Sequence, residues 1–255
     1  MYELALFAGA GGGILGGKLC GFTCVGAVEI EDYARKVLLQ RQRDGHLPKF
    51  PIWDDVSTFR RDNEETREFI ELLRSVREQL VITGGFPCQD ISAAGKGAGI
   101  AEGTRSGLWF EMARIISEIR PSRVLVENSP MLTSRGLGIV LADLAKMGYD
   151  AQWGVLGADK IGARHSRESI WIVANNTCQA MEKQEMVQQK KSNGEPRRIA
   201  SHTPKGIWSL GWSVYEPQMV GASHDLANWV GRSKAIGNGQ VPAVVKAVWS
   251  ILNAV

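Results

Sequence analysis

Short apolar runs alternate with longer amphipathic stretches over the first 174 residues, and this pattern limits the fold more than any other feature of the sequence. Five runs are short, rich in β-branched side chains and bounded by turn residues, which is typical of buried strands: 2–7, 24–29, 80–84, 123–127 and 169–174. The stretches with apolar residues at helical spacing are 31–43, 63–79, 106–119 and 134–147. The alternation predicts an α/β fold in which helices cover both faces of a parallel sheet. In such folds ligands bind at the carboxyl ends of the strands.

Composition places the chain among ordinary globular proteins. Its 255 residues are 44% apolar and 22% charged, which is enough for one domain, or one large and one small domain. We expect a cytoplasmic protein without a membrane contact, because the sequence has neither an apolar run of about 18 residues nor a secretory leader. The four cysteines are scattered and form no CxxC pair, which argues against a disulfide framework and against a zinc site.

Residues 175–234 break the alternating pattern. This segment is polar, lacks a strong period and is interspersed with tryptophans, so we expect a separate small domain there, with 1–174 and 235–255 forming the main domain. Its eight basic and five acidic side chains account for the whole net charge of +3. From charge alone, a solvated surface loop and a nucleic-acid contact both remain open. A Gly/Asn turn and an apolar helix starting at Pro242 follow.

Two of the predicted strand ends carry the features of a nucleoside site. The glycine-rich segment 7–13 follows the first strand, and glycines there allow close approach of the backbone to a ligand. Glu29 ends the second strand and can accept hydrogen bonds from two ribose hydroxyls, which fits NAD and any other adenosine cofactor. A third loop, "WDDV" at 53–56, carries Asp55, which can accept a hydrogen bond from an adenine amino group while the side chain of Val56 covers the ring. A tight turn or a helix cap is the structural alternative for each of these residues.

Two further loops carry reactive groups. In "GGFPCQDIS", residues 84–92, Pro87 and the glycines fix a turn that holds the thiol of Cys88 outward. In "VENSP", residues 126–130, Glu127 closes the next strand. A thiol and a carboxyl at neighbouring strand ends can act as a nucleophile and a proton donor. The thiol can attack only where its surroundings favour the thiolate form. If each residue is considered alone, the structural alternative is that Cys88 is an unreactive core cysteine and Glu127 a surface glutamate.

The ordered set of motifs "FAGAGG", "VEIE", "DDV", "GFPCQDIS", "VEN", "RHSRES" and "AIGNGQVP" resembles the DNA cytosine-5 methyltransferases. The resemblance covers nearly the whole chain, and the Pro-Cys-Gln and Glu-Asn elements are its most specific parts. It implies a Rossmann-like, S-adenosylmethionine-dependent methyltransferase sheet with a small target-recognition domain at residues 175–234. It also implies S-adenosyl-L-methionine in place of NAD, double-stranded DNA as the substrate, a monomer, and a cognate restriction endonuclease as a partner.

The same resemblance assigns roles to individual residues. Cys88 would attack C6 of a flipped cytosine, Glu127 would bind and protonate N3, and Arg167 would belong to the arginine motif of the catalytic site. The residues that match methyl-donor positions are Phe7, Gly9, Gly11, Glu29, Ile30, Asp55, Val56, Pro87, Leu108 and Asn238. Two alternatives stay open: a catalytically impaired DNA-binding homologue and an RNA cytosine-5 methyltransferase.

The chain departs from the family at one motif. Relatives carry Gln-x-Arg-x-Arg, or a His in its first place, whereas this chain has His165, Arg167 and then Ser169 in place of the final arginine. Losing a charge-assisted contact of that kind costs about 1.5–3 kcal/mol, or roughly a tenfold to more than a hundredfold loss of rate. The hypothesis from sequence is an active but slow enzyme, in which a Ser169→Arg substitution would raise the rate.

Overall fold

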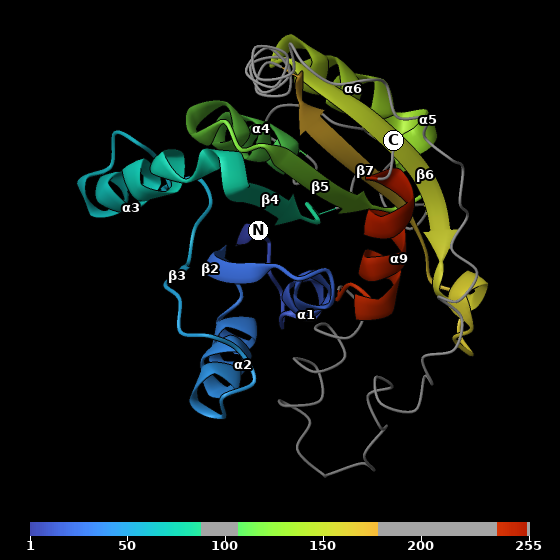
Figure 1. Cartoon of the computed structure of the whole chain (residues 1–255), viewed down its shortest axis with the longest axis horizontal. Coiled ribbons are helices and arrows are strands. Elements are labelled where there is room, and N and C mark those ends of the chain that lie inside the picture. The colour runs from blue at the N-terminus through green and yellow to red at the C-terminus, as the bar shows by residue number, and fades with distance from the viewer. Residues whose placement is uncertain (88–106, 178–238, 254–255) are drawn as a thin grey trace, which may run out of the picture.

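A seven-stranded sheet forms the centre of the computed structural model, which describes residues 1–87, 107–177 and 239–253 (Figure 1). The strand order is β3-β2-β1-β4-β5-β7-β6. The strands are β1 (Tyr2–Leu6), β2 (Thr23–Val28), β3 (Ile52–Trp53), β4 (Leu80–Gly84), β5 (Arg123–Asn128), β6 (Tyr149–Gly157) and β7 (Glu168–Asn176). All five strands predicted from sequence are present, and each lies within two residues of its expected bounds.

The sheet is mixed, which corrects the prediction of a purely parallel one. Strands β1 to β5 pair in parallel, but β7 runs antiparallel to both β5 and β6. The physical reason is a short connection: only the turn of 3₁₀ helix η3 (Ala158–Ile161) and a few further residues join β6 to β7, too few for a parallel crossover. Strand β6 was not predicted, because it lies at the edge of the sheet and many of its residues are partly exposed.

Helices cover both faces of the sheet, as expected. In Figure 1 the helices α1 (Gly12–Leu19), α2 (Asp32–Arg43) and α9 (Pro242–Leu252) lie below the sheet. Above it lie α4 (Leu108–Ile119), α5 (Leu132–Arg135) and α6 (Leu137–Lys146), with α3 (Glu64–Ser75) beside α4. The expected helix at 63–79 ends at Ser75 and continues only as the 3₁₀ turn η1 (Arg77–Gln79). No helix in the described ranges combines the length and the apolarity needed to span a bilayer.

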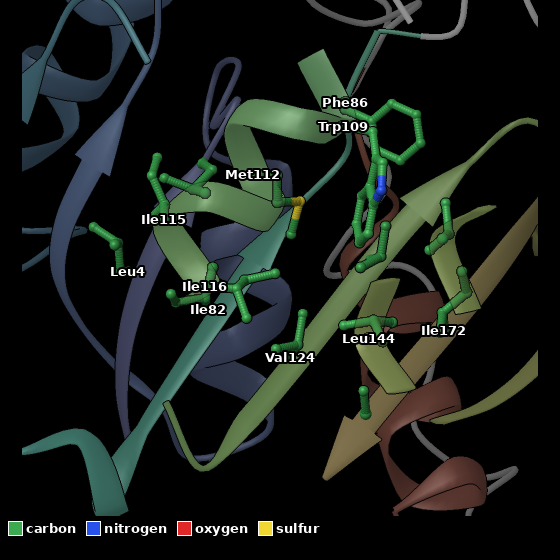
Figure 2. Close-up of a cluster of buried hydrophobic side chains, with 14 of the residues drawn as sticks. Leu4, Ile82, Phe86, Trp109, Met112, Ile115, Ile116, Val124, Leu144 and Ile172 are labelled. Atoms are coloured by element: carbon green, nitrogen blue, oxygen red, sulfur yellow. The ribbon is translucent and has the colours of Figure 1, made fainter. Parts of the chain in front are cut away.

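The larger core cluster lies between the sheet and the upper helices. Figure 2 shows Leu4, Ile82, Val124 and Ile172, from four strands, packed beneath α4 and α6; the labelled partners on these helices are Trp109, Met112, Ile115, Ile116 and Leu144. The opposite face of the strands packs on α9, where Val244, Val245 and Val248 are buried. Burial on both faces explains why the strands appear as continuous apolar runs in the sequence.

The alternation of side chains decides where polar groups on these strands point. Leu125 of β5 and Trp171 of β7 belong to the cluster on the α9 face. Because successive residues of a strand point to opposite faces, Glu127 and Ser169 share that face. Strand β7 continues to Asn176, past the proposed domain boundary at residue 174, and residues 178–234 of the proposed small domain lie outside the described ranges.

Candidate active site

The loop after β1 is held in a strained conformation by Glu29. Phe7 has a φ of 53°, in the left-handed region that non-glycine residues rarely adopt, and Gly9 and Gly11 also have positive φ. The N–H of Gly9 donates to Glu29 Oε2 at 2.6 Å, and the N–H of Glu31 donates to Glu29 Oε1 at 2.8 Å. Glu29 thus joins the loops that follow β1 and β2. A carboxylate offers about four acceptor positions, so both oxygens can still accept from ribose hydroxyls.

The loop after β3 presents Asp55 and Val56 at the same edge of the sheet. Asp55 Oδ1 accepts from the N–H and the Oγ hydroxyl of Ser57, both at 2.8 Å, which forms a local turn. The side chain of Val56 is buried. On the neighbouring loop Ile30 is 67% exposed, so its apolar surface is free to cover a ligand.

Arg114 of α4 supports the Asp55–Val56 loop. Its guanidinium donates to the carbonyl oxygens of Val56 at 2.9 Å and Phe59 at 3.1 Å. Its guanidinium also forms ion pairs along the same helix: Nη2 lies 2.7 Å from Glu111 Oε2, and Nη1 lies 2.8 Å from Glu118 Oε1. The predicted cofactor residue Leu108, which is half-buried, begins this helix, so α4 connects two parts of the candidate site.

The reactive loop after β4 is described up to Pro87. Asn128 donates from Nδ2 to the carbonyl oxygen of Phe86 at 2.9 Å, and this bond fixes the backbone just before Pro87. The predicted residues Cys88 and Asn238 lie outside the described residues. Desolvation raises the pKa of the Cys20 thiol to about 12 and that of the Cys24 thiol further still, and the charge of Glu3 adds to both shifts. Neither of these thiols is suited to nucleophilic attack at neutral pH.

Glu127 stands where the sequence placed the catalytic acid, at the end of β5. Desolvation raises the pKa of its carboxyl; a side-chain hydrogen bond from Ser169, the charge of Arg167 and a side-chain hydrogen bond from Gln240 each partly offset that rise. The bond from Ser169 Oγ to Glu127 Oε1 is 2.6 Å long. A carboxyl in this setting keeps its proton at a higher pH than a free glutamic acid does, which suits a proton donor.

One small cavity joins the glycine-rich loop to this carboxyl. Its volume is about 30 Å³, and its lining includes Phe7, Gly9, Gly85, Glu127 and Gln240. The predicted cofactor loop and the predicted catalytic acid therefore face a common space. Arg167 is half-buried just before β7, and its charge acts on Glu127.

The motif order and this arrangement agree with a direct comparison of sequences. The profile of the family described as "C-5 cytosine-specific DNA methylase" matches residues 1–247. The chain belongs to this family. The α/β sheet with its antiparallel β7 is accordingly the Rossmann-like sheet of an S-adenosylmethionine-dependent methyltransferase.

Curated members of the methylase family align with about two thirds of the chain. The Type II methyltransferase M.Sau96I of Staphylococcus aureus is 33% identical over 171 residues, which are 66% of this chain and 37% of that protein. The Type II methyltransferase M.NgoBI of Neisseria gonorrhoeae is 33% identical over 178 residues, 68% of this chain and 50% of that protein. The chain thus spans half or less of the length of these relatives.

Solved structures show the same methylase fold. A methyltransferase encoded within an Escherichia coli prophage superposes with a TM-score of 0.54 at 24% identity, covering 71% of this chain and 48% of that one. The Dnmt2 methyltransferase of S. pombe superposes with a TM-score of 0.51 at 18% identity, covering 69% of this chain and 49% of that one.

Sequence reasoning about the methylase site missed three supporting residues. Asn128 and Gln240 lie inside quoted motifs, next to residues that were assigned roles, but their partners belong to distant segments. Arg114 lies inside an amphipathic helix, where its spacing from Glu111 and Glu118 indicates only ion pairs along the helix. Its bonds to the loop at 56–59 follow from the tertiary fold, and no local pattern signals them.

Proposed function

We propose that this chain transfers a methyl group from S-adenosyl-L-methionine to C5 of cytosine in double-stranded DNA. The observation that carries the proposal is the carboxyl of Glu127, desolvated and facing the same cavity as the glycine-rich loop. Membership of the cytosine-specific methylase family supports the choice of base and of ring position.

The residues of the glycine-rich edge fit the proposed cofactor. Among the residues that the structure describes, a Cβ built at Gly9 would meet no atom within 4 Å, so these residues leave this side of the loop open to a ligand. The buried Glu29 carboxylate would bind the ribose, Asp55 would accept from the adenine amino group, and exposed Ile30 would pack on the nucleoside. Phe7, Gly11, Val56, Pro87, Leu108 and Asn238 complete the proposed site. When bound, S-adenosyl-L-methionine supplies a methyl group attached to a positively charged sulfur.

Residues of the chain activate the cytosine. The thiolate of Cys88 forms a bond to C6 while Glu127 gives its proton to N3, and the electron pair of the C5–C6 double bond becomes available at C5. After C5 has accepted the methyl group, a base removes the C5 proton. The electron pair left behind re-forms the C5–C6 double bond, the C6–sulfur bond breaks to release the thiolate, and N3 returns its proton to the Glu127 carboxylate. Covalent addition replaces one difficult step with several easier ones.

The target carbon lies inside the stacked duplex, so the cytosine must be flipped out, at a cost of roughly a few kcal/mol. We assign residues 175–234 to target recognition, because their excess of basic side chains can neutralise phosphates. Residues 1–174 and 235–255 would form the catalytic domain.

Labelled S-adenosyl-L-methionine offered in parallel to duplex DNA and to RNA tests this function. We expect label in duplex DNA, at C5 of cytosine, and none with a Cys88→Ala variant. Label in RNA alone would replace the proposed substrate, and label in neither nucleic acid would leave a DNA-binding homologue without activity.

A further inference from the structure

The Glu127 carboxyl is held between two neutral side chains from different parts of the fold. In the antiparallel pairing of β5 with β7, Glu127 lies opposite Trp171. Ser169 is two residues from Trp171 on the same strand, so it is a diagonal neighbour of Glu127 on the same face. Its hydroxyl is buried and donates to Glu127 Oε1 at 2.6 Å.

Gln240 approaches the carboxyl from the other side. It donates a side-chain hydrogen bond to Glu127. A Cβ built at Gly85 would lie 2.6 Å from Glu127 Oε2 and 3.2 Å from Gln240 Nε2, so this oxygen and this nitrogen are neighbours beside Gly85. The other end of the amide faces the cofactor loop, because a Cβ at Gly13 would lie 2.6 Å from Gln240 Oε1.

We propose that Ser169 and Gln240 are positioning residues, which orient the Glu127 carboxyl toward the cytosine ring by holding its two oxygens separately. The proposal deepens the proposed function and rests on it for its catalytic consequence. Ser169 donates to Oε1, Gln240 holds the Oε2 side, and the rotation of the carboxyl group is thereby fixed. Gln240 also connects the acid to the glycine-rich loop, so the proton donor and the cofactor site share one support.

The neutrality of both donors has a chemical purpose. The charge of Arg167 already favours the ionised carboxylate of Glu127. A second guanidinium at residue 169 would favour it further, whereas a hydroxyl orients the carboxyl without adding another opposite charge. Glu127 must carry a proton in order to give it to N3. Ser169 is therefore a functional replacement for the arginine that relatives carry, and Ser169→Arg should not raise the rate.

The test compares Ser169→Ala and Gln240→Leu with two matched controls. Ser134→Ala and Gln40→Leu remove exposed side chains whose hydrogen bonds, among the described residues, stay within their own helical segments. Ser169→Thr keeps the hydroxyl and serves as the conservative variant. Gln240→Asn, which keeps an amide but shortens it, replaces Gln240→Leu if the latter fails to fold by circular dichroism.

The first readout is the pH profile of kcat for methyl transfer. We expect Ser169→Ala and Gln240→Leu each to lower kcat about tenfold or more with KM for DNA unchanged. Ser169→Ala should also leave KM for the methyl donor unchanged, whereas Gln240→Leu should raise it, because Gln240 contacts the glycine-rich loop. Each should move the alkaline limb to higher pH, because a lost hydrogen bond to the carboxylate raises the pKa of Glu127. Ser169→Thr should restore both properties, and Ser169→Arg should move the alkaline limb to lower pH.

The second readout does not depend on activity: a ¹³C NMR titration of the Glu127 carboxyl, assigned with Glu127→Gln. An upward shift of its pKa in Ser169→Ala and Gln240→Leu, but not in the two controls, supports the contacts even if the wild type transfers no methyl group. In that case the proposed function alone would fail. An unmoved titration, or values of kcat within twofold of wild type in both variants, would overturn the proposal.

Discussion

Glu3 is a second carboxyl on the α9 face of the sheet, and its surroundings differ from those of Glu127. Its side chain is fully buried in β1, Thr83 donates to Oε1 at 2.7 Å, and Oε2 has no hydrogen-bond partner among the described residues. A Cβ at Gly17 would lie 2.5 Å from Oε2, so α1 packs closely over this oxygen. Burial raises the pKa of Glu3 to about 8, although the bond from Thr83 opposes the rise. The protonated acid is therefore the form that the fold accommodates.

Glu3 should make the stability of the protein fall as pH rises. The unfolded chain loses this proton near the ordinary value of 4.5 and the folded chain only near 8, so the stabilising contribution is complete below 4.5 and lost by about 8. Glu3→Gln mimics the protonated form, and its advantage over wild type should grow across this window by on the order of a few kcal/mol. Urea unfolding at a series of pH values measures the difference. If the free energy of unfolding has the same pH dependence in Glu3→Gln and in wild type, the prediction is wrong. The control is Glu68→Gln, which changes an exposed side chain.

Gly85 should be intolerant of a side chain for a reason that concerns activity. Its added Cβ would lie 2.6 Å from Glu127 Oε2, so the carboxyl must move. Because displacement of a catalytic group by about 1 Å can cost a hundredfold in rate, we expect Gly85→Ala to lower kcat by one to two orders of magnitude. The control is Gly138→Ala, since a Cβ at Gly138 would meet no atom of the described part of the chain within 4 Å. Comparable kcat values in single-turnover assays of the two variants would refute this reasoning.

At the scale of elements, helix α4 connects the adenine end of the proposed cofactor site to the core. One face of α4 buries Trp109, Met112, Ile115, Ile116 and Ile119, and Arg114 is only partly exposed beside the loop at 56–59. The helix thus provides a rigid support for that loop.

Replacing Arg114 should weaken cofactor binding more than stability. Arg114→Met removes two hydrogen bonds to loop carbonyls, and we expect the Kd for S-adenosyl-L-methionine to rise roughly tenfold. Titration calorimetry measures this effect. The matched control is Arg61→Met, which breaks an ion pair whose two side chains are 54% and 45% exposed. An unchanged Kd in Arg114→Met would show that the loop does not need this support.

The sequence predicted the buried elements well and the irregular ones poorly. Strands with two buried faces and helices with one apolar face leave strong periodic signals, and α2, α4 and α9 begin within two residues of the expected positions. Strand β3 has only two residues, too few for a pattern. The expected helix at 134–147 is broken by Gly136, whose φ of 145° ends α5 and precedes α6. Glycine allows this backbone conformation, but a glycine in the sequence does not by itself predict that a helix is interrupted.

At the scale of the whole molecule, the parallel order of β1 to β5 brings the candidate site together. The predicted residues Phe7, Glu29 and Asp55 follow β1, β2 and β3, and Glu127 lies at the end of β5. The parallel pairing places these strand ends along one edge of the sheet. That convergence was predictable from sequence. The hydrogen bonds from Ser169 and Gln240 to Glu127 could not be predicted from the sequence. They depend on the antiparallel register of β7 and on the chain segment that precedes α9.

The proposed reaction requires that the thiol of Cys88, supported by the Glu127 acid, adds to cytosine in DNA. A duplex containing 5-fluorocytosine tests it most directly, because fluorine at C5 cannot leave as a proton does and the adduct is trapped. Incubated with S-adenosyl-L-methionine, the wild type should form a covalent complex stable in denaturing electrophoresis. Cys88→Ala should form none, and Glu127→Gln should form it far more slowly. No adduct with the wild type, or an adduct that persists in Cys88→Ala, would contradict the claim.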